Sequence, residues 1–293
     1  MLNFKTIKLK ELRQAPLKMS LFFLAFTLLF TSGCNTLFYQ PDHALHYDPK
    51  SIGFDPEVVR WESKDGTKLY GWHFKSKLKK PKGTIVQFHG NAENLSSHYA
   101  SLVWVTLKGY DLFTFDYRGY GQSEGSPSRD GVHMDCLSAI EKSFELHKKR
   151  NGNKFVLYGQ SLGGAALLGA YTDPSSTNDV DLLVLESTFY SYQDVAFDFA
   201  QKSWVTYLIS PLAYLVVSDS KSAEGKLHSI KKPVVLIHDK KDPVVSYQRG
   251  RDIYDNLDTQ KWFWDLDDGY HIAAMVSSKS GYREKFLELL ETL

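Results

Sequence analysis

Residues 154–171 read KFVLYGQSLGGAALLGAY, and this stretch decides the fold. Its first part, FVLY, is a continuous apolar run of strand length, which is typical of a parallel strand buried on both faces. Its last part, LGGAALLGAY, is rich in alanine and leucine and favours a helix. Glycines stand two residues before and two residues after Ser161. The stretch therefore predicts a strand over 154–158, a tight turn at Ser161 and a helix over 161–171.

Segments of these two kinds alternate on both sides of the stretch, from residue 57 onward. The expected strands cover 57–62, 68–74, 84–88, 111–115, 154–158, 181–185, 233–237 and 261–264. The expected helices cover about 95–107, 132–150, 161–171, 246–256 and 280–293. Regular alternation of strands and helices predicts an α/β domain with a mostly parallel sheet.

A stretch of 46 residues between Glu186 and Pro233 interrupts this alternation. It contains ten large apolar side chains between Trp204 and Val217. We interpret about 188–230 as a cap inserted into the domain. Its apolar content favours an acyl or alkyl group in the substrate, although an ordinary packed helix explains it equally well.

The composition is that of an ordinary globular protein, with 43% apolar and 24% charged residues. A net charge of +1 gives no reason to expect a nucleic-acid partner. The two cysteines do not form a disulfide framework. Cys136 falls in an expected helix, where we expect a buried thiol.

The N-terminal 33 residues have a different character. They carry five basic residues and one acidic residue, followed by an apolar run over 19–30. This run is shorter than the roughly 20 residues that a membrane-spanning helix needs. With Ser32 and Gly33 directly before Cys34, the segment resembles a bacterial lipoprotein signal, although Thr31 stands where that family usually has an aliphatic residue.

The lipoprotein resemblance implies that Cys34 is lipidated on its thiol and becomes the first residue of an exported protein. The protein would then be held on a membrane, facing the periplasm or the cell exterior. An uncleaved anchor or an ordinary signal peptide is the alternative. In this interpretation residues 1–33 are the signal, 34–54 a linker and 55–293 the folded domain.

Four segments of the domain together resemble the α/β-hydrolase family. They are HGNAEN at 89–94, DYRGYGQSEG at 116–125, GQSLGG at 159–164, and HDKKDPVV at 238–245 followed by GYH at 269–271. The similarity extends over about residues 55–293 and is strongest with serine esterases, acyl thioesterases and serine aminopeptidase-like proteins. It implies a twisted, mostly parallel sheet of about eight strands, helices on both faces and a small cap.

Ser161 is the expected nucleophile, because the Gly-x-Ser-x-Gly turn exposes a serine at the start of a helix. A serine hydroxyl needs a neighbouring base, and in this fold the order along the chain is serine, acid, histidine. Of the histidines after Ser161, His271 follows the last expected strand and can reach the carboxyl edge of the sheet. His228 and His238 are the other two histidines in this part of the chain.

The acid that orients the base is expected in the loop after the strand over 233–237. Asp242 precedes Pro243 in a turn and is our choice, and Asp239 is its competitor. Relatives often have glycine at the position of Asp239. Glu186, just after the strand over 181–185, is a more distant alternative. The acid holds the imidazole in the correct tautomer and stabilises the imidazolium.

The oxyanion that forms on the substrate needs backbone N–H donors beside the nucleophile. One donor is expected from Leu162, the residue after Ser161, and the other from Asn91 in the loop His89-Gly90-Asn91. We expect His89 to be a structural hydrogen-bonding residue in this loop.

These features predict a membrane-associated serine hydrolase that cleaves carboxylic esters or thioesters through an acyl-serine intermediate. Its substrate would be a small molecule or an acylated partner. A peptidase acting on short peptides is the alternative, and a non-catalytic envelope protein on a hydrolase scaffold is a third possibility. The sequence has neither a HExxH motif nor a phosphate-binding GxxxxGK[ST] loop, so we expect no metal and no cofactor. It leaves the oligomeric state open.

Overall fold

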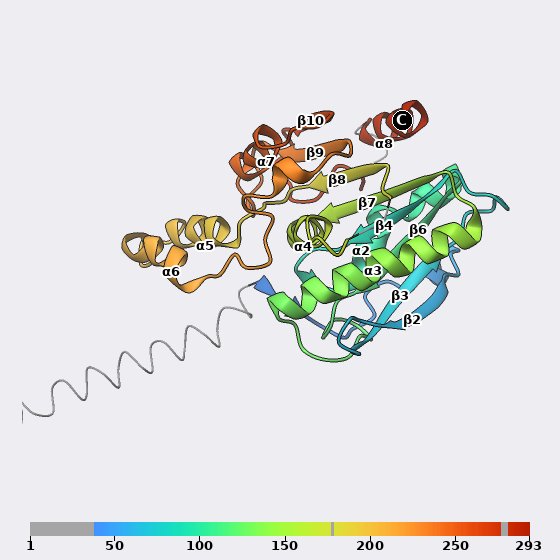
Figure 1. Cartoon of the computed structure of the whole chain (residues 1–293), viewed down its shortest axis with the longest axis horizontal. Coiled ribbons are helices and arrows are strands. Elements are labelled where there is room, and N and C mark those ends of the chain that lie inside the picture. Colours follow the sequence, from blue (N-terminus) through green and yellow to red (C-terminus); the bar gives the residue numbers. More distant parts are fainter. Residues whose placement is uncertain (1–37, 177–178, 277–280) are drawn as a thin grey trace, which may run out of the picture. The chain divides into compact units, whose positions relative to one another are not determined.

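The computed structural model describes residues 38–176, 179–276 and 281–293, and the expected signal and Cys34 lie outside these ranges. An eight-stranded sheet runs through the described part of the chain in the order β10-β9-β8-β7-β4-β6-β3-β2. The two pairs that involve β3 are antiparallel, and the other neighbouring strands are parallel. The predicted α/β-hydrolase fold, with a mostly parallel sheet and flanking helices, is confirmed (Figure 1).

The elements agree with the sequence pattern to within a few residues over most of the domain. The strands of the large sheet are β2 (Glu57–Glu62), β3 (Lys68–Phe74), β4 (Gly83–Phe88), β6 (Tyr110–Asp116), β7 (Lys154–Gln160), β8 (Leu182–Glu186), β9 (Val234–Asp239) and β10 (Lys261–Leu266). The helices that flank it are α2 (Leu95–His98), α3 (Arg129–Arg150), α4 (Leu162–Tyr171), α7 (Tyr247–Asp255) and α8 (Tyr282–Thr292).

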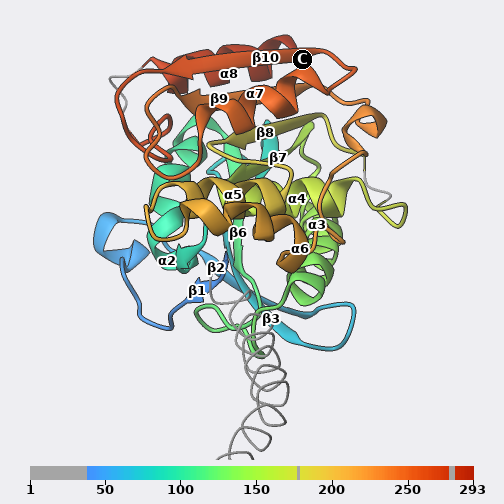
Figure 2. The same cartoon turned by 90° about the vertical axis from the view of Figure 1, so that its left-hand side faces the viewer.

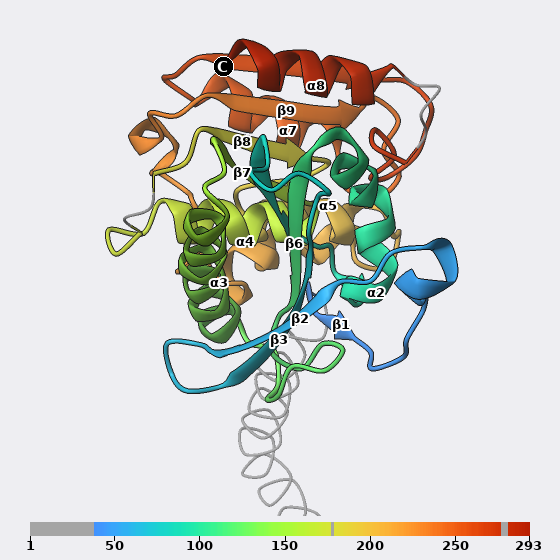
Figure 3. The same ribbon diagram turned by 90° about the vertical axis from the view of Figure 1, so that its right-hand side faces the viewer.

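Helices cover both faces of the sheet, because alternate side chains of each strand point to opposite sides. On one face, the Phe155 ring of β7 packs edge-on against Phe144 of α3, with ring centroids 5.1 Å apart. On the other face, Tyr158 of the same strand packs against Phe286 of α8. Figure 3 shows α3 and α4 on one side of the strands, with α2 on the opposite side.

The helix expected over 95–107 is wrong, because only α2 is α-helical there. The chain continues as two 3-10 segments, η2 (Tyr99–Ser101) and η3 (Val103–Lys108). The hydroxyls of Ser101 and Thr106 donate to the carbonyls of His98 and Val103, each three residues earlier. Such local bonds compete with regular helix, and β-branched residues disfavour it further.

Residues 39–54, which the sequence assigns to a linker, belong to the compact unit over 39–293. The two-residue strands β1 (Gln40–Pro41) and β5 (Ala92–Glu93) pair in parallel. The Asp42 carboxylate accepts hydrogen bonds from the Asn94 amide at 2.7 Å and from His46 at 2.9 Å. These contacts fix the segment against the loop that follows β4.

The insertion between β8 and β9 forms the expected cap. Its elements are α5 (Tyr192–Gln201), η4 (Tyr207–Leu212), α6 (Ala213–Val216) and η5 (Leu227–Ser229). Figures 1 and 2 show α5 and α6 beyond the carboxyl end of β8, away from the helices that flank the sheet. No helix within the described ranges combines the length and the apolarity needed to cross a bilayer.

A buried carboxylate joins β3, β6 and the end of α3. Asp111 has no exposed side-chain surface and lies 2.9 Å from the Arg150 guanidinium and 3.3 Å from the His73 imidazole. Burial acts to raise the pKa of Asp111, but the contacts with His73 and Arg150 outweigh it and lower the pKa to about 2. The ionised form of Asp111 therefore contributes to the stability of the folded state.

We expect Asp111→Asn to remove an acid-sensitive part of this stability. A carboxyl whose pKa is lower in the folded state contributes fully above its unfolded value of about 3.9, and the contribution is lost as the pH falls toward the folded pKa. A shift of this size corresponds to about 2 kcal/mol. Urea unfolding at pH 7 and pH 3 should show a smaller loss of stability in Asp111→Asn than in the wild-type protein. An equal loss in both proteins would contradict the prediction.

Candidate active site

Ser161 lies at the turn between β7 and α4, in the backbone conformation φ 52°, ψ −122°. Non-glycine residues rarely adopt positive φ, and such strain is often found at functional sites. Two hydrogen bonds hold the turn in place. The Ser161 N–H donates to the Glu186 carbonyl at 2.9 Å, and the Thr188 hydroxyl donates to the Ser161 carbonyl at 2.6 Å.

The glycines of the Gly-x-Ser-x-Gly motif are needed because the backbone passes close to other chain segments. A Cβ on Gly163 would lie 2.2 Å from the Phe88 carbonyl oxygen at the end of β4. A Cβ on Gly159 would lie 2.5 Å from the Gly164 Cα. Both distances are far below a van der Waals contact, so a larger side chain at either position would push the turn away from β4 and α4.

The structure brings His271 and Asp242 together. The His271 Nδ1 lies 2.8 Å from an Asp242 carboxylate oxygen, and the Asp242 side chain has no exposed surface. The other Asp242 oxygen accepts the Val244 N–H at 2.8 Å and the Val245 N–H at 3.0 Å. Burial acts to raise the pKa of Asp242, but the hydrogen bond with His271 and these backbone donors keep it below its usual value. Asp242 is thus built to hold a negative charge beside the imidazole.

Asp239, the competing acid, has a different position. One of its carboxylate oxygens accepts the N–H groups of Asp268 and Gly269 at 2.8 and 2.9 Å, and the other accepts the Lys241 N–H at 2.7 Å. Asp268 and Gly269 belong to the loop that leads to His271. Asp239 therefore shapes the loop that carries the histidine, and the hydrogen bond to the imidazole comes from Asp242.

The two other histidines that follow the serine have different environments. His238 is buried, and its Nε2 hydrogen bonds to the Val245 carbonyl at 3.1 Å. Its Nε2 lies 3.7 Å from Asp242, so it borders the site behind the acid. His228 is exposed on η5. Neither His228 nor His238 makes the hydrogen bond to Asp242 Oδ2 that His271 makes.

Glu186, the third candidate acid, is buried at the end of β8. One of its carboxylate oxygens accepts the Ala274 N–H at 2.9 Å, three residues after His271. The other accepts the Tyr158 hydroxyl and the Gln160 amide, both at 2.9 Å. Burial raises the pKa of Glu186 more than these hydrogen bonds and the nearby His271 lower it. Glu186 thereby ties the His271 loop to β7, which leads directly into Ser161. Its position at the end of an expected strand is the one signal in the sequence that points to it.

Gly90 marks the place where the Ser161 turn and the histidine loop meet. A Cβ on Gly90 would lie 3.7 Å from the Ser161 Cβ and 3.5 Å from the Ile272 side chain, next to His271. Among the described residues, no hydrogen bond joins the Ser161 hydroxyl to the imidazole. Catalytic hydrogen bonds are often long in the free enzyme and tighten when substrate binds.

The expected oxyanion donors, Leu162 and Asn91, directly follow Ser161 and Gly90 in the chain. Leu162 is the first residue of α4, where backbone N–H groups lack partners within the helix. Asn91 directly follows Gly90, and its side-chain oxygen accepts the Gln40 N–H at 2.9 Å. The Asn91 carbonyl accepts the Tyr120 hydroxyl at 2.8 Å. Asn91 is therefore held from two sides by chain segments distant in the sequence.

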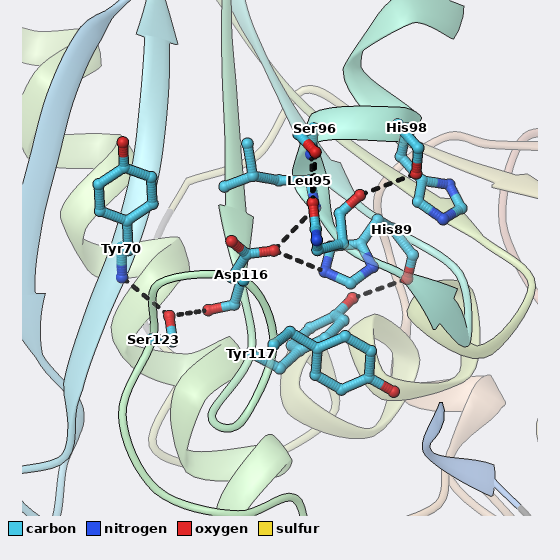
Figure 4. A network of polar contacts seen from close by, with 12 residues as sticks. Tyr70, His89, Leu95, Ser96, His98, Asp116, Tyr117 and Ser123 are labelled. Carbon is cyan, nitrogen blue, oxygen red and sulfur yellow. Dashed lines mark hydrogen bonds and ion pairs between the residues drawn. The ribbon is translucent and has the colours of Figure 1, made fainter. Parts of the chain in front are cut away.

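A buried network supports the loop that carries Asn91 (Figure 4). The Asp116 carboxylate accepts the Leu95 N–H at 2.7 Å and lies 3.6 Å from His89 Nε2. The Tyr117 hydroxyl donates to the His89 carbonyl at 3.0 Å. His89 is fully buried among these groups. This is the structural position that the sequence predicts for His89.

The apolar side chains of the cap lie mostly in solvent. Trp204, Leu208 and Leu215 are among the most exposed large apolar residues of the described chain. These side chains are therefore not packed against the domain as those of an ordinary buried helix would be. The two carboxylates of α5, Asp194 and Asp198, are both paired with the Arg249 guanidinium, at 3.0 and 2.8 Å.

A serine in a strained turn after a central parallel strand, together with a histidine bonded to a buried carboxylate, is typical of serine hydrolases with the α/β-hydrolase fold. Residues 79–222 match the family model described as serine aminopeptidase, S33. The protein YfhR of Escherichia coli K12 is 34% identical over 261 residues, which cover 86% of each chain. This chain therefore belongs to the same family of α/β-hydrolases as YfhR.

More distant proteins share parts of this similarity. The lysophosphatidylserine lipase ABHD12 of Danio rerio is 31% identical over 228 residues, which cover 74% of this chain and 57% of the lipase. An esterase of Pyrococcus furiosus has the same fold, with a TM-score of 0.68 at 18% identity over 87% of this chain and 97% of its own. At that identity the esterase supports the fold alone.

Proposed function

We propose that this protein is a membrane-associated hydrolase of carboxylic esters or thioesters, with Ser161 as nucleophile, His271 as base and Asp242 as the acid. The observation that carries the proposal is the 2.8 Å hydrogen bond between His271 and the Asp242 carboxylate, whose side chain has no exposed surface. The loop that contains His271 meets the Ser161 turn at Gly90. The remaining steps follow from the chemistry of these groups.

In the first half of the reaction the Ser161 hydroxyl attacks the carbonyl carbon, and His271 Nε2 accepts its proton. The His271 Nδ1–H stays bonded to Asp242, which stabilises the imidazolium. The negative oxygen of the tetrahedral intermediate accepts N–H bonds from Asn91 and Leu162. When the intermediate collapses, the bond to the alcohol or thiol breaks, and His271 returns its proton to that leaving group.

In the second half water attacks the acyl–Ser161 ester. His271 accepts a proton from the water, and a second tetrahedral intermediate forms at the same oxyanion site. Its collapse releases the carboxylic acid and returns the proton to the Ser161 oxygen. No group other than water is consumed, so the cycle balances without a cofactor.

The pairing of the two α5 carboxylates, Asp194 and Asp198, removes both as partners for the free amino terminus of a peptide substrate. An aminopeptidase needs a carboxylate that is free to bind the substrate ammonium. Both carboxylates of α5 are already bound to Arg249, which fixes α5 against α7. The name of the lipase from Danio rerio adds support for a lipid ester as substrate.

Three substrates with the same acyl group test this assignment: a p-nitrophenyl ester, a thioester and a p-nitroanilide. For each substrate the rate with the full-length protein in detergent is divided by the uncatalysed rate. This ratio should be at least about tenfold larger for the ester and the thioester than for the amide. A series of esters of increasing chain length then defines the acyl group. A preference for an aminoacyl p-nitroanilide would instead establish the peptidase alternative.

The membrane association is proposed to arise from a lipid on Cys34. Cells that express the protein are fed labelled palmitate, and the protein is then isolated. Cys34→Ser should abolish incorporation, whereas Cys136→Ala, which changes the other cysteine of the chain, should retain it. Cys136 is a buried free thiol on α3 and is suited to this control. Incorporation in Cys34→Ser would reject the lipoprotein assignment.

Glu186 is expected to act as a positioning residue for His271. Glu186→Gln would place an amide N–H against the donors of Ala274, Gln160 or Tyr158, and the His271 loop would shift. A displacement of about 1 Å at the reacting groups can lower kcat by about 10²-fold. We expect a loss of this order, measured as ester hydrolysis by a variant that keeps its wild-type circular dichroism spectrum.

Tyr158→Phe is the matched control for Glu186→Gln. It removes one donor to Glu186 but leaves the Ala274 bond intact. We therefore expect it to retain most of kcat. If Tyr158→Phe reduces kcat as much as Glu186→Gln does, the hydrogen bond from the Ala274 N–H to Glu186 is not what positions His271.

A further inference from the structure

We propose that the exposed apolar face of the cap docks into a lipid surface and orients the site toward the membrane. We call this face the cap surface, and it is formed by Trp204, Val205, Tyr207, Leu208 and Leu215. The inference rests on the proposed lipid tether, and it adds a second contact with the membrane that the tether alone does not supply.

The exposure of the cap surface is unusual for a soluble domain. Trp204 is 89% exposed, Leu208 86% and Leu215 80%. Soluble monomers rarely leave so many large apolar side chains together in water, and such patches commonly mark protein or membrane contacts. The segment 202–217 contains one lysine and no carboxylate. Docking in lipid would therefore require little desolvation of charge.

The helix that precedes the cap surface, α5, is fixed to the rest of the domain by several contacts. On α5, Val195 and Ala196 are buried, and Asp194 and Asp198 bind Arg249 of α7. At the end of α5, the Lys202 ammonium donates to the carbonyls of Pro243 and Val244 at 2.8 and 3.0 Å. These bonds attach the cap to the loop that carries Asp242, so the apolar face points outward from a fixed base.

The place where the chain leaves the domain favours lipid as the partner of this surface. Tyr39, the first residue of the compact unit, is buried beside Tyr192, the first residue of α5. Cys34 precedes Tyr39 by five residues, and an extended chain of this length spans at most about 18 Å. A lipid on Cys34 would therefore hold a membrane within that distance of the base of α5. No comparable argument on chain length favours a second protein copy.

The arrangement would also serve the proposed reaction. The cap follows β8, and Ser161 follows the neighbouring strand β7 at the same edge of the sheet. Val244, whose carbonyl accepts from Lys202, is 38% exposed and stands two residues after Asp242 in the same loop. Docking of the cap surface would therefore bring this edge of the sheet toward the lipid.

Quenching of tryptophan fluorescence by brominated lipids tests the docking directly. The full-length protein is reconstituted into vesicles of phosphatidylethanolamine and phosphatidylglycerol, with brominated or unbrominated acyl chains. Trp204→Phe removes the reporter but keeps an aromatic side chain. We expect brominated lipid to quench the wild type and the quenching to fall by more than half in Trp204→Phe. Equal quenching in the two proteins would overturn the proposal, since the tether alone does not bring Trp204 into the acyl region.

A second pair of variants tests whether docking matters for hydrolysis. Leu208→Ser combined with Leu215→Ser should lower hydrolysis of an ester dissolved in the vesicles by about tenfold or more, because two leucines lose their apolar contact with lipid. Hydrolysis of water-soluble p-nitrophenyl acetate should be unchanged. Leu107→Ser is the control, since Leu107 is 69% exposed on η3, outside the cap. An unchanged vesicle rate in the double variant would overturn the proposal.

The outcomes distinguish failure of the docking proposal from failure of the proposed hydrolase activity and of the proposed tether. If neither ester is cleaved but Trp204 is quenched, the hydrolase assignment fails and docking stands. If Cys34→Ser incorporates as much labelled palmitate as the wild type but wild-type Trp204 is quenched, the proposed tether is rejected and the cap surface is an independent anchor. If Trp204 is unquenched and the protein forms dimers that Leu208→Ser with Leu215→Ser dissociates, the cap surface binds a second copy and the lipid proposal is rejected.

Discussion

Ser161→Ala is expected to abolish covalent labelling by a fluorophosphonate and to lower ester hydrolysis by about 10⁴-fold or more. The alanine keeps the backbone of the turn but removes the only atom that can form the acyl intermediate. The oxyanion donors remain, so a small residual rate above that of water is expected. Labelling of the full-length protein with the probe, followed by turnover of a p-nitrophenyl ester, measures both effects.

Ser187 offers a matched control for this experiment. It follows β8 as Ser161 follows β7, it is buried, and its φ of 51° is close to the 52° of Ser161. The alanine in Ser187→Ala should therefore have the same strained backbone conformation as that in Ser161→Ala, but the protein should still react with the fluorophosphonate. If Ser161→Ala is still labelled, or if Ser187→Ala loses labelling while folded, Ser161 is not the nucleophile.

The central part of the fold could be predicted because its signals are local. The run FVLY is apolar on both faces, which only a strand in the middle of a parallel sheet requires, and a helix-forming run follows the glycines at once. Residues 154–171 therefore contain a whole strand–turn–helix unit. The structure adds the close approach of Gly163 to the Phe88 carbonyl, which explains the glycine but could not be read from its neighbours in the sequence.

Other parts depend on contacts between distant residues, and the sequence pattern is correspondingly weak there. Strand β1 has two residues and exists because it pairs with β5, some 50 residues away. A two-residue strand has no periodicity to detect, so the segment 39–54 looks like a linker. Likewise, the pattern of the cap shows that it is apolar but not that its apolar side chains face solvent. That depends on how the cap contacts distant parts of the chain, such as the pairing of α5 with Arg249.

The two aspartates at the end of β9 and in the loop that follows it, Asp239 and Asp242, show the same limit within the site. They are three residues apart, and each is well placed in the sequence to be the acid. The distinction depends on which carboxylate points to His271 and which points to the backbone of the loop after β10. That choice is made by the turn at Asp242, whose Oδ1 accepts the Val244 and Val245 N–H groups and so leaves Oδ2 directed at the imidazole.

Asp242→Asn is expected to lower kcat by about 10³- to 10⁴-fold while the protein stays folded. The amide can accept the backbone N–H bonds of Val244 and Val245 through its oxygen, but its NH₂ group then faces His271 Nδ1. The imidazole would bind in the tautomer that carries its proton on Nε2, and this nitrogen could no longer accept the proton of Ser161. Ester turnover and the rate of fluorophosphonate labelling should fall together, because both reactions need the activated serine.

Asp239→Asn is the control for Asp242→Asn, because it makes the same chemical change three residues away. Its amide would lose part of the hydrogen bonding to Lys241 or to Asp268 and Gly269, which should lower the free energy of unfolding by about 1–3 kcal/mol. The His271–Asp242 bond would remain, so kcat should fall at least about 10²-fold less than in Asp242→Asn, given the size of the tautomer effect. If the folded Asp239→Asn variant loses more activity than Asp242→Asn, then Asp239 provides the charge that orients the base, and the static hydrogen bond at Asp242 does not describe the working enzyme.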